Sequence, residues 1–122
     1  MNTKALKAAM DWKETGIIKG VKVRQIPIEG NACYYGVGSD SYGYQIGKVS
    51  DDGTKFEVLR EDGSLYGMAI LATRKNFRAR GRYFFADSQG KPSYYRSRGS
   101  ICGSICVTNE AGCGTTYLDP SF

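Results

Sequence analysis

The chain has 122 residues, with 17 Lys and Arg against 12 Asp and Glu, a net charge of +5, and no histidine. Its length suits one domain with a buried core, and sixteen glycines, nine tyrosines and three prolines favour a turn-rich β protein over a helical bundle. Histidine is the usual general base near neutral pH and the commonest metal ligand. The nucleophile-elbow, P-loop and dinucleotide-binding motifs are absent as well. We therefore expect a protein that is not an enzyme and that uses neither a cofactor nor a metal.

The first element predicted by the sequence is an amphipathic helix over residues 3–15. Thr3 suits its N-cap, Gly16 suits its C-terminal end, and the apolar residues between them recur at helical spacing. Met10 and Trp12 belong to that apolar face, which we expect to pack on a sheet; binding of a partner is the alternative. No unbroken apolar run occurs here, so we expect no signal peptide, no membrane span and a cytoplasmic protein.

Residues 17–122 have the composition of a β-rich segment, with β-branched residues between short polar turns. Asp-Gly pairs at 52–53 and 62–63 lie between runs of strand formers and predict hairpin turns, and a third turn is expected at 89–91. We therefore predict one α+β domain over residues 1–122, mainly β, in which the helix precedes a small antiparallel sheet or barrel.

The positive charge is concentrated between Arg74 and Arg98, where eight basic residues accompany one acid, a net of +7. If residues 77–85 form a strand, alternate side chains point to opposite faces. One face would then hold Phe77, Ala79, Gly81, Tyr83 and Phe85, and the other Arg78, Arg80 and Arg82. An antiparallel neighbour would place Arg96 and Arg98 beside this arginine row, giving an arginine-lined strand pair.

Such a row has the chemistry of a phosphate-binding surface. A guanidinium group binds phosphate through two parallel hydrogen bonds, which lysine cannot do. Tyr94 or Tyr95 would stack on a base next to the phosphates. The alternative is a charged, solvated edge that prevents aggregation between sheets, but a row of like charges costs stability that a purely structural role does not require.

Cysteines form the other candidate group. Cys102, Cys106 and Cys113, with the distant Cys33, have a spacing compatible with a zinc site. We favour reduced cysteines acting as small core residues, because three close cysteines and an outlier are a weaker signal than two pairs.

Three segments resemble a family of small phage- and prophage-encoded proteins: "GVGSDSYGYQIGKVSDDGTKFEVLRED", "TRKN" and "YLDPSF". The matching positions are Ser39, Asp40, Tyr42, Tyr44, Arg74, Lys75, Asn76, Asp119, Pro120, Ser121 and Phe122. The resemblance implies a small β-barrel-like fold and a phage setting, in which anti-defence proteins often act by binding. Phe77 departs from the family pattern, which has glycine there.

We therefore predict a non-catalytic phage-type protein that binds a nucleotide-derived host defence signal, or single-stranded nucleic acid, in the host cytoplasm. The predicted ligand-binding residues are Arg74, Asn76, Phe77, Arg78, Arg80, Arg82, Tyr94, Tyr95, Arg96 and Arg98. The alternative is a protein-interaction inhibitor of a host defence protein, or a virion component. A homo-oligomer formed through exposed sheet edges is a further alternative.

Overall fold

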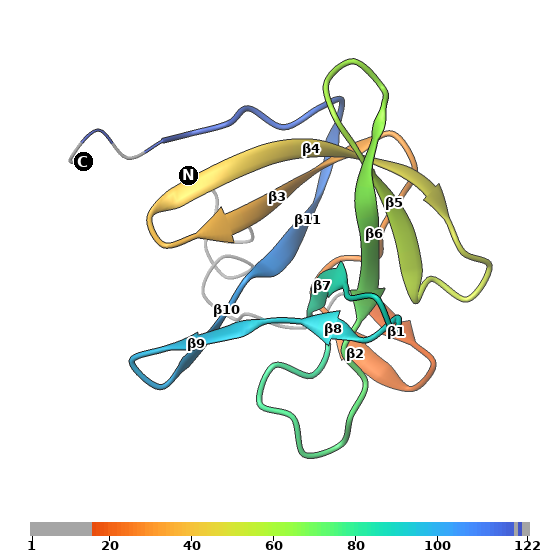
Figure 1. Ribbon diagram of the computed structural model, residues 1–122. Helices are drawn as coiled ribbons and strands as arrows, with labels where there is room; N and C mark the ends of the chain where they lie inside the picture. The colour runs from red at the N-terminus through yellow and green to blue at the C-terminus, as the bar shows by residue number, and fades with distance from the viewer. Residues whose placement is uncertain (1–15, 119, 121–122) are drawn as a thin grey trace, which may run out of the picture.

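The computed structural model describes residues 16–118 and 120, and these residues form an all-β protein (Figure 1). No helix occurs among them, so the α+β assignment is wrong; the helix predicted over residues 3–15 lies outside the described residues. The strands are β1 (Gly16–Ile18), β2 (Val21–Val23), β3 (Asn31–Val37), β4 (Asp40–Val49), β5 (Lys55–Leu59), β6 (Leu65–Leu71), β7 (Tyr83–Ala86), β8 (Pro92–Ser93), β9 (Tyr95–Ser97), β10 (Ser100–Cys102) and β11 (Ser104–Ala111).

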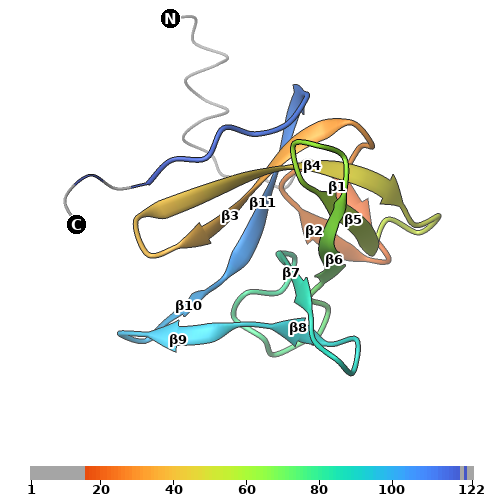
Figure 2. The same cartoon turned by 45° about the horizontal axis from the view of Figure 1, so that its top comes forward.

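Six of these strands close into an antiparallel barrel. They run in the order β11-β3-β4-β5-β6-β7, and β11 pairs again with β7 through Ser104–Phe84 and Ile105–Tyr83. The predicted antiparallel sheet or barrel is therefore a closed barrel, which removes most exposed sheet edges. Strand β8 pairs with the end of β7, and the β9–β10 hairpin continues from β8 away from the barrel (Figures 1 and 2).

The barrel interior is filled by alternate side chains of its strands. Phe56 lies opposite Ala69, and Ile46 lies opposite Val58. The buried core also contains side chains of β1 and β2, so this hairpin packs against the barrel. Together the buried core residues are Ile18, Val21, Val23, Cys33, Ile46, Phe56, Val58, Ala69, Leu71, Tyr83 and Ile105.

Two predicted turns are confirmed by the backbone conformation. Gly53 and Gly63 have φ values of 77° and 86°, which glycine adopts without steric cost. The preceding aspartates cap the turns, because Asp52 Oδ1 accepts a hydrogen bond from the Thr54 N–H at 3.0 Å and Asp62 does the same for the residue after Gly63. Local sequence therefore fixes the β4–β5 and β5–β6 connections.

Tyr83 joins the core to one of these turns, and we expect Tyr83→Phe to lower the free energy of unfolding by about 1–2 kcal/mol. Its hydroxyl donates a hydrogen bond of 2.6 Å to the Gly53 carbonyl, and its ring lies 5.0 Å from the Phe56 ring. The variant keeps the ring and leaves the carbonyl without this donor. Denaturant unfolding measures the change, with Tyr117→Phe as the control because the Tyr117 ring is exposed. Equal stability of both variants would contradict the expectation.

Candidate functional site

The first half of the predicted 77–85 strand is a loop. Strand β7 begins only at Tyr83, and residues 72–82 follow a series of turns. Within them the Phe77 N–H donates to the Arg74 carbonyl, and the Arg80 N–H donates to the Phe77 carbonyl, each at 3.1 Å. The strand prediction is therefore wrong for residues 77–82 and correct for the residues that follow.

The alternation of burial on which the strand prediction relied is nevertheless present. Phe77 and Ala79 are buried, whereas the arginines between and after them are exposed: Arg78, Arg80 and Arg82. A turn that returns a side chain to the core at every second residue gives the same pattern as a strand. Gly81, with φ 93°, lies against the backbone of β2 at Lys22, so the loop is packed on the β1–β2 hairpin.

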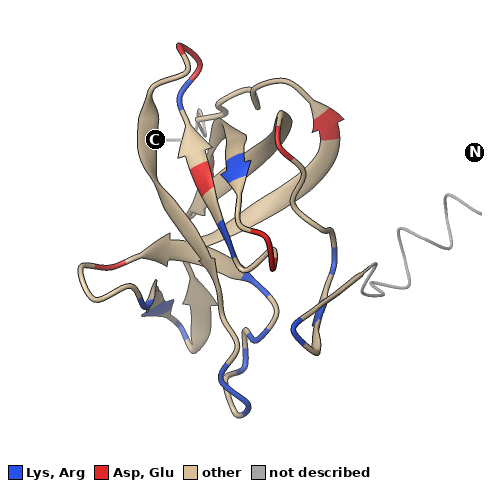
Figure 3. Cartoon of the chain, turned by 90° about the vertical axis from the view of Figure 1, so that its right-hand side faces the viewer, with Lys and Arg blue, Asp and Glu red and all other residues tan. Residues whose placement is uncertain are grey.

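The predicted pairing of the Arg96 segment with the arginine row is also wrong. Strand β9 pairs with β10, placing Arg96 opposite Ile101, and Arg98 lies in the turn with φ 52°. The two basic segments still meet, because an Arg78 guanidinium N–H donates to the Gly99 carbonyl at 3.2 Å. Lys and Arg gather around this loop and the neighbouring hairpins, in the lower part of Figure 3.

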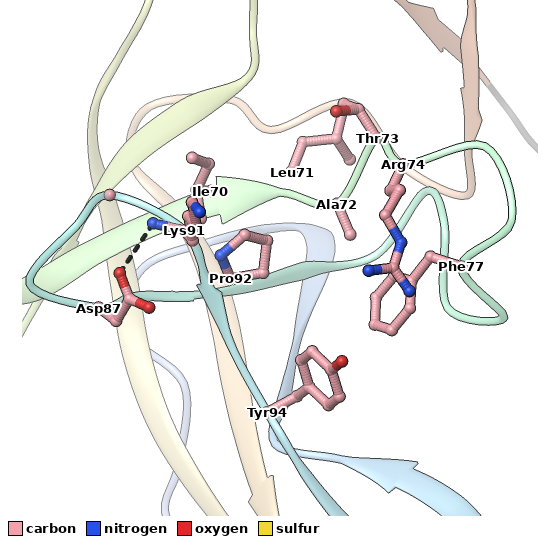
Figure 4. Close-up of a pocket in the computed structure, with 11 residues that line it drawn as sticks. Ile70, Leu71, Ala72, Thr73, Arg74, Phe77, Asp87, Lys91, Pro92 and Tyr94 are labelled. Atoms are coloured by element: carbon pink, nitrogen blue, oxygen red, sulfur yellow. Dashed lines mark hydrogen bonds between the residues drawn. The ribbon is translucent and has the colours of Figure 1, made fainter.

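A groove of about 470 Å³ lies where the 72–82 loop leaves β6 and faces the β7–β8 hairpin (Figure 4). Its polar lining comes from Thr73, Arg74, Lys91 and Asp87, and its aromatic lining from Phe77 and Tyr94. This volume falls within the range typical of small-molecule sites. We call this surface the Arg74 groove.

Aromatic rings and guanidinium groups form a row along the Arg74 groove. The Phe77 and Tyr94 rings lie 4.9 Å apart, and the buried Phe84 ring supports both at 6.1 and 6.0 Å. The Arg74 guanidinium lies 5.6 Å from the centre of the Phe77 ring, and that of Arg96 lies 5.9 Å from the centre of the Tyr94 ring. The row therefore has a cation at each end and two aromatic rings between them.

Asp87 supplies the negative charge in the lining, and its carboxylate is committed to the β7–β8 turn. Its Oδ1 accepts hydrogen bonds from the N–H groups of Lys91 at 2.9 Å and Gln89 at 2.8 Å. These two hydrogen bonds hold the pKa of Asp87 below its ordinary value, and the bond from the Lys91 N–H has the larger effect. Anion binding in the groove would therefore depend on the side chains of Arg74 and Lys91.

The structure brings together only part of the predicted site. Arg74, Phe77 and Tyr94 line the groove, and Arg96 lies at its rim. The other predicted residues lie elsewhere: Asn76, Arg78 and Arg80 on the exposed side of the loop, Arg82 beside β11, Tyr95 on β9 and Arg98 in the β9–β10 turn.

Three polar lining residues, Thr73, Asp87 and Lys91, were not among the predicted site residues. Lys91 belongs to the basic segment counted in the sequence, which was the available signal. Its place in the groove lining depends on the hairpin register, in which Phe85 pairs with Ser93 and Ala86 with Pro92. The periodicity of the sequence does not predict that register.

All four cysteines are free thiols. Cys33 is fully buried in the barrel, as expected of a small core residue, whereas Cys106 is exposed and the other two are half-buried. Within residues 16–118 and 120, no three Cys, Asp or Glu side chains are grouped so that they could hold a metal ion. The zinc alternative therefore gains no support from these residues.

Comparison with protein-family models, curated proteins and solved structures finds no match for this chain. The resemblance to phage-encoded proteins therefore stays a prediction. In the described part of the chain, no helix has the length and apolar character needed to cross a bilayer.

Proposed function

We propose that this protein binds a nucleotide-type, phosphate-bearing ligand in the Arg74 groove without transforming it. The observation that carries the proposal is the row of Arg74, Phe77, Tyr94 and Arg96, which combines charge and aromatic surface beside a groove of about 470 Å³. The exposed Tyr94 ring offers a stacking face for a base, and the guanidinium and ammonium groups of Arg74 and Lys91 would neutralise phosphate.

A soluble nucleotide and a single nucleic-acid strand share this chemistry, and salt distinguishes them. A strand contacts several phosphates and releases counterions, so its affinity falls steeply between about 50 and 200 mM salt. A nucleotide held mainly by stacking and hydrogen bonds depends less on salt. In a phage setting, the first case would be sequestration of a nucleotide-derived defence signal in the host cytoplasm.

Arg74→Gln should weaken binding of ATP or of a short oligonucleotide by at least about tenfold, because it removes one guanidinium group from the row of cations and aromatic rings along the groove. Arg60→Gln is the matched control for Arg74→Gln. The Arg60 guanidinium also lies over an aromatic ring, Tyr66, at 5.1 Å, but outside the groove. A ligand at about 100 times its dissociation constant should raise the free energy of unfolding by about 2.7 kcal/mol, which a thermal-shift titration detects.

The two variants separate a site from a general charge effect. The proposal fails if both lower the affinity equally, because non-specific attraction then explains binding. It also fails if neither ATP nor the oligonucleotide stabilises the wild-type protein at any salt concentration. A Tyr94→Ala variant that keeps full affinity would remove the stacking part of the proposal and retain the phosphate part.

A further inference from the structure

Strand β11 has an edge that is only partly paired. One edge pairs with β3, but the other meets β7 only at Ser104 and Ile105. Strand β7 begins at Tyr83, and the chain before it turns away into the 72–82 loop. Beyond Ile105, no strand in the described part of the chain pairs with this second edge. Among the described residues, the barrel is therefore closed along a short stretch and has no strand beside residues 106–109.

A second groove, of about 540 Å³, lies along this open edge. Its walls are residues 23–25 at the end of β2, residues 81–83, and six consecutive residues, 104–109. Because side chains alternate between opposite faces of a strand, a consecutive run lines a groove through its backbone edge. Ser104 and Ile105 pair with β7, and the Thr108 carbonyl accepts a hydrogen bond from the Asn31 side-chain amide at 3.4 Å. The main-chain groups left for the groove are therefore those of the alternate residues within 106–109 that face away from β3.

The charge of this second groove is positive. Arg82 is exposed and lines it, and no Asp or Glu occurs among its described lining residues. The Arg82 carbonyl is already held by the Ala72 N–H at 2.9 Å, which fixes the backbone from which the guanidinium projects. Charge complementarity therefore favours an occupant with acidic side chains.

We propose that residues 106–109 of β11 accept an extended acidic peptide of a partner protein as an added strand. An unpaired edge alternates donors and acceptors, and another polypeptide backbone matches that alternation whereas a phosphate chain does not. Acidic side chains of the added strand would contact Arg82. This site is separate from the Arg74 groove, because the two share no lining residue, and it does not depend on nucleotide binding.

The test uses an acetylated heptapeptide of alternating Glu and Val. Its counterpart is N-methylated at one central Glu and the adjacent Val. The two methyl groups remove one N–H donor from each edge of the peptide and keep its charge. Calorimetry should show binding of the first peptide and an affinity at least about tenfold lower for the second, because the ladder bonds are lost. Amide exchange should slow within residues 106–109, at the alternate N–H groups that face away from β3, when the first peptide binds.

Arg82→Ala should lower the affinity for the first peptide. Arg74→Ala is the matched control, which should leave that affinity unchanged. Equal affinity of the methylated and unmethylated peptides would overturn the proposal, because charge alone then explains binding. Amide protection elsewhere on the barrel would overturn it as well. Protection of residues 106–109 that rises with protein concentration in the absence of peptide would overturn it too, by assigning the edge to a second copy of the chain.

Discussion

Gly81→Ala should destabilise the protein by about 3 kcal/mol or more, as measured by denaturant unfolding. Gly81 has φ 93°, a conformation that costs an L-residue about 1–2 kcal/mol. A Cβ here would also collide with the Lys22 carbonyl oxygen. That oxygen belongs to β2, whose Val21 and Val23 are buried in the core, so the loop has to separate from the hairpin.

The same substitution should weaken ligand binding in the Arg74 groove. The Gly81 N–H donates to the Ala72 carbonyl at 2.9 Å, and this bond holds the base of the loop that carries Arg74 and Phe77. If this end of the loop is displaced, the Arg74 guanidinium and the Phe77 ring move away from the Tyr94 ring. We expect the affinity for ATP to fall with the loss of stability, by at least about tenfold.

Gly63→Ala is the matched control for Gly81→Ala. Gly63, in the β5–β6 turn, has a similar φ of 86°, but no heavy atom lies within 4 Å of the position that an alanine Cβ would take there. The Gly63→Ala variant should therefore lose only the conformational cost, about 1–2 kcal/mol. If the two variants lose equal stability, the contact between Gly81 and Lys22 does not hold the loop.

Features of the fold that depend on local sequence were predictable. An Asp-Gly pair combines a side chain that caps a turn with a residue that tolerates positive φ, and both pairs form turns between consecutive strands. The closure of the barrel was not predictable, because Ser104 and Ile105 pair with Phe84 and Tyr83 across about twenty residues of intervening chain. A strand pattern does not say which distant strand it meets.

The loop at residues 72–82 shows why periodicity misled the assignment. Phe77 and Ala79 are buried as the pattern requires, but turn hydrogen bonds and the positive φ of Gly81 produce the alternation. The glycine was the available signal, since glycine within a strand pattern often marks a bend or a close backbone approach. The approach of Lys22 to that glycine is a tertiary contact that the sequence does not reveal.

The residues predicted from the sequence include only part of the lining of the candidate site. Arg74, Phe77 and Tyr94 come together because the loop and the β7–β8 hairpin fold back on each other. The expected row of arginines on one strand does not exist, so phosphate contacts would come from one arginine and Lys91 on different elements. Composition identified the basic segment, and the hairpin register decided which of its cations face the groove.

Raising the pH from about 9 to 12 should lower the free energy of unfolding, with Cys33 contributing up to about 4 kcal/mol of the loss. Burial in the barrel, with a smaller contribution from Cys113 and Cys106, raises the pKa of the Cys33 thiol from 9.0 to about 12. The unfolded chain therefore loses this proton first as the pH rises. The stabilisation is complete below pH 9 and disappears as the pH passes the folded-state value.

Cys33→Ala should flatten this alkaline dependence, and Cys106→Ala is the control for the removal of an exposed thiol. Tyrosines add a slope that both variants retain: burial and a hydrogen bond with Tyr66 raise the pKa of Tyr44 to about 12, and burial raises the pKa of Tyr83. The difference between the variants therefore isolates the buried thiol. A Cys33→Ala protein with the wild-type slope would mean that the thiolate forms without cost, which is incompatible with a dry barrel interior around Cys33.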